Sequence, residues 1–119
     1  DVDMVLDMRF MPNPFYIPAL RPLSGLDAPV REFVLAQPQA PEFFDTLESH
    51  IRRLLPLYIA QDKRIFRICF GCTGGRHRSV AAAAEMARRF AGGEWNVRAY
   101  HRDIGFEAAD IRERFRARS

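Results

Sequence analysis

The residues best suited to chemistry occupy positions 71–79, which read Gly-Cys-Thr-Gly-Gly-Arg-His-Arg-Ser. An apolar run typical of a buried strand, 65–70, comes before them, and a run typical of a helix, 80–90, comes after. A glycine-rich turn between a strand and a helix directs successive backbone N–H groups at one point, with the positive end of the helix dipole behind them. The pattern therefore predicts a site for a doubly charged anion, and we expect a phosphate monoester.

The side chains of this loop favour the same ligand. The two glycines let backbone amides approach a ligand closely, and the guanidinium of Arg78 can bind two phosphate oxygens at once. The alternative is a tight turn whose arginines point into water, although such a turn has no use for so many adjacent donors. No lysine stands where a nucleotide P-loop needs one. The candidate ligand-binding residues of the loop are Cys72, Thr73, Gly74, Gly75, His77, Arg78 and Ser79.

One enzymatic alternative fits the same loop. Residues 72–79 match the C-x-x-G-x-x-R-S signature of cysteine phosphatases, in which the thiolate attacks phosphorus while the arginine holds the oxygens. Cys72 and Arg78 would then be catalytic, and the reaction also requires a general acid, for which Asp103 and Asp7 are the candidates. The residue before the cysteine is a glycine, where those enzymes usually have a histidine. Binding without catalysis is therefore the interpretation that we favour.

Other chemistries receive less support from the sequence. Cys69 and Cys72 form a C-x-x-C pair, but a redox dithiol usually opens a helix, whereas Cys69 lies in a strand pattern. The three histidines show no ligand spacing, so we expect neither a metal nor a cofactor. No apolar run approaches the ~20 residues of a membrane span. Two cysteines do not make a secreted disulfide scaffold, and a cytoplasmic location is the expectation.

The elements around the loop alternate between strand and helix. Each helix pattern is bounded by proline or glycine, and a proline-rich stretch after the first strand is expected to be a stiff, ordered loop. This alternation predicts an α/β fold, a small three-layer open sheet with mainly parallel strands and helices on both faces. The predicted strands are 2–10, 65–70 and 96–100, the predicted helices are 27–35, 41–58 and 80–90, and the loop is 11–25.

Polar residues follow each predicted strand. Asp7 and Arg9 lie near the end of the first strand, the 71–79 loop follows the second, and His101 begins a His-Arg-Asp cluster after the third. Right-handed crossovers place the carboxyl ends of such strands on one edge of the sheet, where ligands bind. We therefore add Asp7, Arg9 and His101 to the candidate site. Asp7 is either a partner of Arg9 or a hydrogen-bonding group for a ligand.

The last residues carry much of the positive charge. Net charge is +3, the isoelectric point is near 9.3, and all 18 cations except Lys63 are arginine. This excess suits phosphate recognition, and the alternative interpretation is codon bias. The spacing of Ile111 and Phe115 predicts a surface helix over 108–118, with arginines in i,i+4 pairs. We treat 105–119 as a charged helical tail to the domain at 2–104. The candidate RNA-binding residues are Arg98, Arg102, Arg112 and Arg116.

Several co-ordered motifs together resemble a known family. They are the 71–80 loop, the segment Asp-Met-Arg-Phe-Met-Pro-Asn-Pro-Phe at 7–15, the segment Leu-Arg-Pro-Leu-Ser-Gly-Leu-Asp at 20–27, and His-Arg-Asp at 101–103. In this order they resemble the C-terminal domain of the RNase adapter RapZ family, bacterial proteins also described as YvcJ-type nucleotide-binding proteins. The resemblance covers residues 2 to about 104, without the family's kinase-like domain and its Walker-type site.

The resemblance implies a regulatory domain that senses a phosphorylated sugar, glucosamine-6-phosphate in the best-known branch. It also implies an adapter that binds a small regulatory RNA, presents it to an endoribonuclease and forms a homo-oligomer. By position, the 72–79 residues would hold the phosphate, and Asp7 and Arg9 would face the sugar with Asn13 and Phe15 beside it. Phe15 stands where the adapter branch has a histidine, and the tail is longer than the family's basic tail and balanced in charge.

Overall fold

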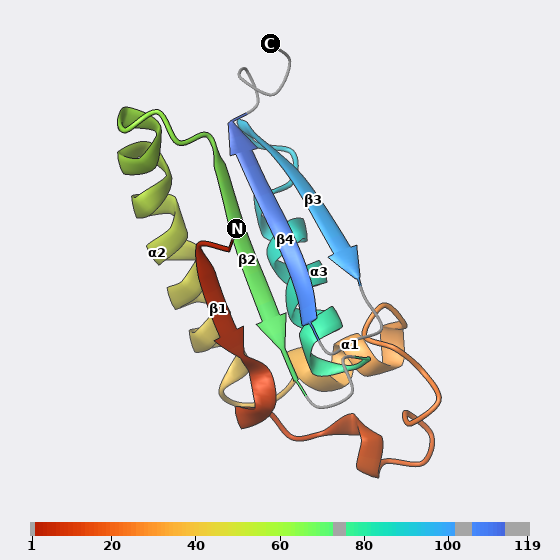
Figure 1. Cartoon of the computed structure of the whole chain (residues 1–119). Coiled ribbons are helices and arrows are strands. Elements are labelled where there is room, and N and C mark those ends of the chain that lie inside the picture. The colour runs from red at the N-terminus through yellow and green to blue at the C-terminus, as the bar shows by residue number, and fades with distance from the viewer. Residues whose placement is uncertain (1, 73–75, 102–105, 114–119) are drawn as a thin grey trace.

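The computed structural model describes residues 2–72, 76–101 and 106–113, with backbone alone for 97–101 and 106–113. Within these residues the helices and strands follow one another in the order that Figure 1 shows. They are the strand β1 (Met4–Asp7), the 3-10 turns η1 (Met8–Phe10) and η2 (Pro14–Tyr16), the helices α1 (Ala28–Leu35) and α2 (Ala40–Ala60), the strand β2 (Ile65–Gly71), the helix α3 (Arg78–Phe90), and the strands β3 (Trp95–His101) and β4 (Phe106–Glu113).

The strands form one sheet in the order β1-β2-β4-β3. β1 is parallel to β2, and β4 is antiparallel to both β2 and β3, so β1, β2 and β3 all run in one direction. The predicted α/β class and the common direction of the three predicted strands are therefore confirmed, and two of the three strand pairs are antiparallel because β4 lies between β2 and β3. The register of the sheet also brings three strand ends to one edge, because Asp7 pairs with Gly71, Gly71 with Phe106, and His101 with Glu107.

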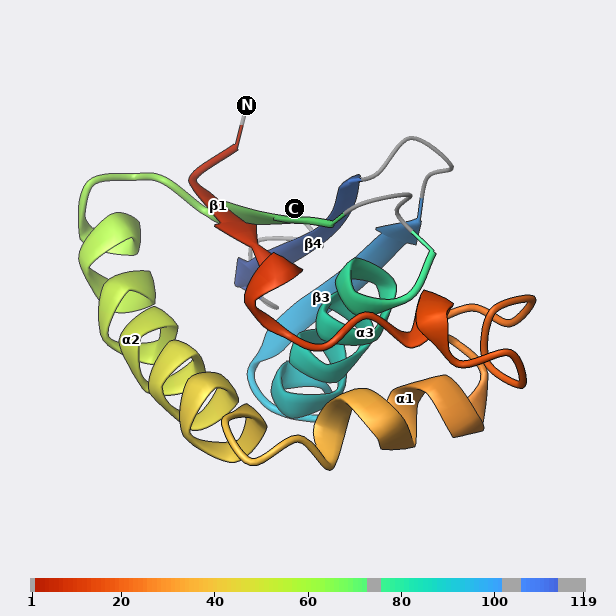
Figure 2. The same cartoon turned by 90° about the horizontal axis from the view of Figure 1, so that it is seen from below.

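The expected helices on both faces are not found among the described residues. Figure 2 shows α1, α2 and α3 on the same side of the sheet, with α3 directly against it. The cause is the strand order: β1 to β2 and β2 to β3 progress in the same direction across the sheet, so right-handed crossovers place both connections on one face. Helices on two faces need a reversal of direction, and this sheet has none.

The core fills the space between the sheet and the helices. In β2, Phe66, Ile68 and Phe70 are buried while the residues between them are only half-buried, so one face of the strand packs against the helices. The run Ala81–Ala83 in α3 is fully buried, which lets this helix lie close to the sheet. No helix in the described part of the chain is long and apolar enough to cross a membrane.

The helices and the first strand lie near their predicted positions, with two changes. The first strand ends at Asp7, and the chain turns into η1 instead of continuing to Phe10. α2 continues past Pro56 to Ala60, so this proline does not end the helix. Proline costs a helix one hydrogen bond and a steric conflict, about 3 kcal/mol. Burial of Phe44, Leu47, Ile51 and Leu55 along one face of α2 opposes that cost.

The terminal segment differs from its prediction. A surface helix was expected over 108–118, but Phe106–Glu113 is the strand β4, which pairs with β2 through residues 106–112 and with β3 through residues 107–113. Long-range pairing with two strands outweighs the local helical spacing of Ile111. As a strand, the segment also satisfies the facing backbone groups of β2 and β3, which a surface helix would leave unpaired. Residues 114–119 lie outside the described part.

Candidate functional site

Asp7 and Arg9 form a fork at the end of β1. Asp7 caps η1 by accepting from the Arg9 amide, and the Arg9 guanidinium donates to both carboxylate oxygens, with Nη2 2.6 Å from Oδ2. The Arg9 side-chain hydrogen bond is the main reason why the pKa of Asp7 falls from 3.8 to about 2. Of the two roles considered for Asp7, the structure thus shows partnership with Arg9. The Arg9 fork therefore favours the ionised form of the Asp7 carboxyl.

Cys72 and Ser79 contact each other across the base of the loop. The Ser79 amide donates to Cys72 Sγ at 3.3 Å, and the thiol donates to Ser79 Oγ at 3.2 Å. Ser79 is completely buried and Cys72 is half-buried. These bonds close the loop by joining the end of β2 to the first turn of α3.

Arg78 is the buried cation of the site. It is only 4% exposed, and its Nη1 donates to the Met11 carbonyl at 2.8 Å and to the Arg9 carbonyl at 3.3 Å. Its Nε is buried and has no hydrogen-bond partner within the described residues. Arg78 therefore joins the loop to the segment after β1 while keeping one donor unused.

The two residues before Arg78 attach the proline-rich loop to the site. His77, also buried, places Nε2 3.2 Å from the Leu20 carbonyl, and Arg76 Nη2 donates to the Pro22 carbonyl at 3.0 Å. Gly25 donates its amide to the Arg76 carbonyl at 2.7 Å. The sequence predicted His77 as a ligand residue, but it gave no signal that these side chains bond to main-chain carbonyls of 20–25.

Asn13 and Phe15 lie beyond this contact, in η2. Asn13 caps η2 by accepting from the Phe15 amide at 3.0 Å. Phe15 is 48% exposed, and the Arg21 guanidinium lies over its ring, 4.9 Å from the centroid. Asn13 thus has a local structural role, and Phe15 presents an exposed ring next to a cation.

The remaining predicted residues are placed less completely. Arg98 and His101 lie in β3 and Arg112 in β4, and their backbones alone are described. Arg112 belongs to a strand and not to the expected helix of arginine pairs, and the other arginines of those pairs lie outside the described part of the chain. Other predicted residues lie outside the described part of the chain, namely Thr73, Gly74, Gly75, Arg102, Asp103 and Arg116.

The loop opens onto the N-terminus of α3, a helix of 13 residues. His77 occupies the N-cap position and makes no side-chain capping bond. The Ser79 amide in the first turn already donates to Cys72 Sγ, but the other amides of a helix start lack helical partners, and the helix dipole makes this end positive. Together with the unused Nε of Arg78, the arrangement can accept an anion.

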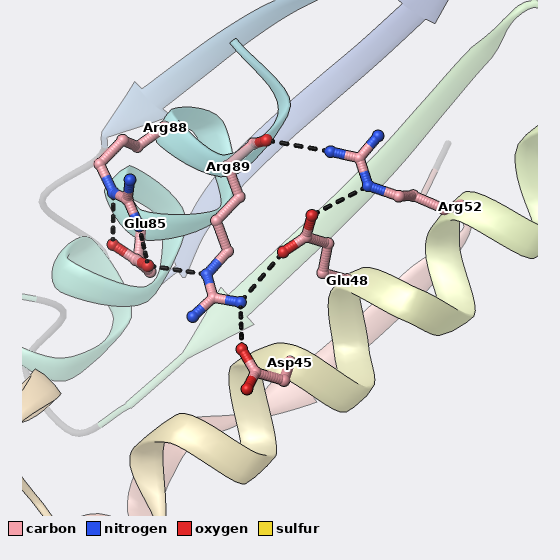
Figure 3. A network of polar contacts seen from close by, with 6 residues as sticks. All are labelled: Asp45, Glu48, Arg52, Glu85, Arg88 and Arg89. Carbon is pink, nitrogen blue, oxygen red and sulfur yellow. Dashed lines mark hydrogen bonds and ion pairs between the residues drawn. The ribbon is translucent and has the colours of Figure 1, made fainter. Parts of the chain in front are cut away.

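A second polar cluster joins α2 to α3 and was not foreseen from the sequence (Figure 3). Arg89 donates to Glu85 on its own helix and to Asp45 and Glu48 on α2, at 2.7, 2.7 and 3.0 Å. Arg52 bonds Glu48 and the Arg89 carbonyl. The i,i+4 spacings 48–52 and 85–89 were the available signal, but they do not reveal that the two helices share the cluster.

Fold and site together define a small α/β domain with a glycine-rich loop between its central parallel strand and a helix. The family model of the RapZ C-terminal domain matches residues 1–105. The chain belongs to this family, which agrees with the resemblance inferred from the motifs.

Curated relatives agree with this assignment. A nucleotide-binding protein of Rubrobacter xylanophilus is 52% identical over 108 residues, which are 87% of this chain and 35% of the relative. A nucleotide-binding protein of a Nocardioides species is 47% identical over 90% of the chain and 36% of its own length, and one of Clostridium botulinum is 47% identical over 88% and 36%. The chain therefore spans about a third of the curated relatives that it matches.

Proposed function

We propose that this domain is a regulatory binding module for a phosphorylated sugar or a similar phosphorylated metabolite. The phosphate would lie at the 71–79 loop, against the start of α3. The single observation that carries the proposal is Arg78: a buried guanidinium that makes no ion pair in the described part of the chain and keeps Nε unbonded at the start of α3, where His77 makes no side-chain cap. A buried charge without a counter-charge is costly, and a phosphate would supply that counter-charge.

The contacts around Arg78 also suggest how binding would be transmitted. Its Nη1 holds the carbonyls of Arg9 and Met11, and the neighbouring His77 and Arg76 hold those of Leu20 and Pro22. A phosphate that draws Arg78 toward itself would compete with these carbonyls. Ligand binding would then change the segment 9–25, which carries the exposed rings of Phe10, Phe15 and Tyr16. Names of the relatives as nucleotide-binding proteins are compatible with such a phosphate site.

Calorimetry with three ligands tests the phosphate requirement without any substitution. Glucosamine-6-phosphate should bind, glucose-6-phosphate reports on the amine, and glucosamine without phosphate should bind at least about tenfold more weakly, because the charge-assisted bonds are lost. Equal affinity for glucosamine and its phosphate would overturn the proposal.

A matched pair of variants tests the role of Arg78. Arg78→Lys keeps the charge but removes Nε and the fork, and we expect at least tenfold weaker phosphosugar binding. Arg53→Gln, at an exposed arginine of α2, is the control and should bind normally. Circular dichroism establishes that both variants are folded. Unchanged affinity in a folded Arg78→Lys domain would contradict the assignment.

Cysteine-dependent phosphatase activity is the second candidate, and the Cys72–Ser79 contact favours it. Amide and hydroxyl groups of Ser79 lie 3.3 and 3.2 Å from Cys72 Sγ, where they would stabilise a thiolate. Turnover of an aryl phosphate that disappears in Cys72→Ser would establish this activity. No turnover in the unmodified domain would leave binding alone.

RNA binding by an oligomeric adapter is the second activity that family membership suggests. In support, Arg98 and Arg112 lie on adjacent strands, two positions apart in the register, where Arg98 pairs with Asp110 and Asn96 with Arg112. A gel-shift assay with a small structured RNA should show binding that weakens steeply with salt, and less so in Arg98→Gln. Light scattering gives the oligomeric state. Absence of a shift at low salt would remove RNA from the proposal.

A further inference from the structure

A pocket separate from the 71–79 loop lies where α1, the start of α2 and the end of α3 meet. Its volume is about 330 Å³. This is near the lower limit for small-molecule sites and leaves room for about ten non-hydrogen atoms, at roughly the 30 Å³ that a water molecule occupies in the liquid. Arg88 follows Arg78 by ten residues of α3, about 15 Å along the helix axis, so this pocket is distinct from the anion loop.

One wall of the pocket is apolar. Ala40 and Phe44 of α2 are almost fully buried, and Leu35 at the end of α1 is half-buried. Pro41, in the first turn of α2, completes this wall. An apolar surface of this kind favours a ligand with a hydrocarbon body.

The other lining residues are three arginines and one carboxylate, and their hydrogen bonds show which arginine side chain is available to a ligand. Glu85, 3% exposed, accepts from Arg88 Nε and Nη2 and from Arg89 Nε, so its two oxygens are occupied. Arg89 is occupied by its three acidic partners. Arg31 of α1 is different, because it lines the pocket half-buried and its side chain makes no hydrogen bond or ion pair within the described residues.

We propose that this pocket binds a small organic monocarboxylate. The carboxylate would form a forked pair with Arg31, and the hydrocarbon body would lie against Leu35, Pro41 and Phe44. The side chain of Arg31 makes no ion pair in the described part of the chain, and a carboxylate would give its guanidinium a forked, charge-assisted partner. Glu85 does not compete for Arg31, since Arg88 and Arg89 already hold both of its oxygens.

Amide chemical shifts of the full chain, titrated with 3-phenylpropionate, test this site. We expect shifts in α1 and at the end of α3, and at least tenfold weaker binding of 3-phenylpropanol, which keeps the ring and lacks the charge. Acetate, which has the charge and lacks the body, should also bind at least tenfold more weakly. Equal binding of the alcohol, or shifts confined to 76–80, would overturn the proposal.

Two variants and a control distinguish binding at this pocket from a general effect of the protein's positive charge. Arg31→Gln should weaken 3-phenylpropionate binding at least tenfold, whereas Arg53→Gln, which removes an equally unpaired but remote charge, should leave it unchanged. Leu35→Glu places a carboxylate one helical turn after Arg31 as an internal competitor, and it should also weaken binding at least tenfold. Unchanged binding in a folded Arg31→Gln domain would overturn the proposal.

The two proposed binding sites can be tested independently of each other. Arg31→Gln should keep its affinity for glucosamine-6-phosphate, and Arg78→Lys should keep its affinity for 3-phenylpropionate. Displacement of 3-phenylpropionate by inorganic phosphate at equal concentration would show that the pocket is only a general anion site, and the carboxylate proposal would then be wrong.

Discussion

At the residue scale, Arg78 is expected to have two roles, one in ligand binding and one in stability, and the sequence indicates only the first. Arg78 was expected to hold a ligand, and in the structure its Nη1 holds the carbonyls of Met11 and Arg9. The site therefore depends on a buried cation that contributes to stability as well as to binding.

Arg78→Ala should consequently destabilise the domain, in addition to weakening phosphate binding. Loss of two hydrogen bonds from a charged donor to buried carbonyls should lower the free energy of unfolding by about 2–3 kcal/mol. Urea unfolding measures this, with Arg76→Ala as the control. Arg76 is exposed and its side chain makes one bond, to Pro22, so its loss should stay below about 1 kcal/mol. An equal small effect in both variants would contradict the structural role of Arg78.

Gly25 is the second residue whose size matters. A Cβ at this position would lie 2.4 Å from the Ala81 amide nitrogen and 2.4 Å from the His77 carbonyl oxygen. Gly25→Ala should therefore force the proline-rich loop away from α3 and cost about 3 kcal/mol of stability, with loss of phosphate binding. Thermal unfolding checks this against Gly93→Ala, where the nearest atom, the Phe90 carbonyl oxygen, lies 3.9 Å from the Cβ. Equal midpoints would show that the loop does not pack this closely.

At the element scale, the position of α3 relative to α2 depends on the cluster around Glu85 and Arg89. Burial raises the pKa of the Glu85 carboxyl, but hydrogen bonds from Arg88 and Arg89 outweigh it and hold the pKa below its ordinary value of 4.5. Burial lowers the pKa of Arg89, but its hydrogen bonds to Asp45, Glu85 and Glu48 outweigh this effect and raise the pKa. Both groups are thus charged in the folded domain near neutral pH, and their attraction joins the two helices.

Glu85→Gln should lose stability in a pH-dependent manner. A carboxyl whose pKa is lowered by folding stabilises the native state above its unfolded pKa, and that contribution disappears as the pH falls through the folded value. We expect the variant to be about 2–4 kcal/mol less stable near pH 7, and the difference to shrink below about pH 4.5. Urea unfolding from about pH 7 to about pH 3 measures it, with exposed Glu32→Gln as the control. A deficit that does not vary with pH would contradict the ionic origin.

At the scale of the whole molecule, the sheet depends on its last strand, β4. β4 lies between β2 and β3, although it comes last in the chain. The matched family region ends at residue 105, before this strand begins. Residues 106–113 are nevertheless an integral strand of the sheet in this structure, because β4 pairs with β2 on one side and with β3 on the other.

A chain that ends at residue 105 should not unfold cooperatively. Removing β4 leaves β2 without one neighbour and β3 without its partner strand, so many backbone groups lose their hydrogen bonds. Circular dichroism during heating compares it with a chain that ends at residue 113, which keeps the strand and should melt in one transition. If both chains melted at the same temperature, β4 would not be part of the stable sheet.

The sequence alone determined the features that local pattern controls. A buried apolar run, a glycine-rich turn and an alanine-rich helix predicted the β2–loop–α3 unit, and chain direction then required β1, β2 and β3 to end at one edge. The order of motifs was also enough to indicate the RapZ family. These predictions succeeded because neighbouring residues supply the physical causes, namely periodicity, turn geometry and the handedness of crossovers.

The tertiary structure alone decided the rest. It directed Arg78 and His77 to carbonyls of distant segments, put all three helices on one face, and made residues 106–113 a strand where the local spacing favours a helix. A donor bonds to whichever acceptor the fold brings near it, and a marginal segment takes the conformation that its partners complete. Both depend on residues far away in the chain, which no local pattern contains.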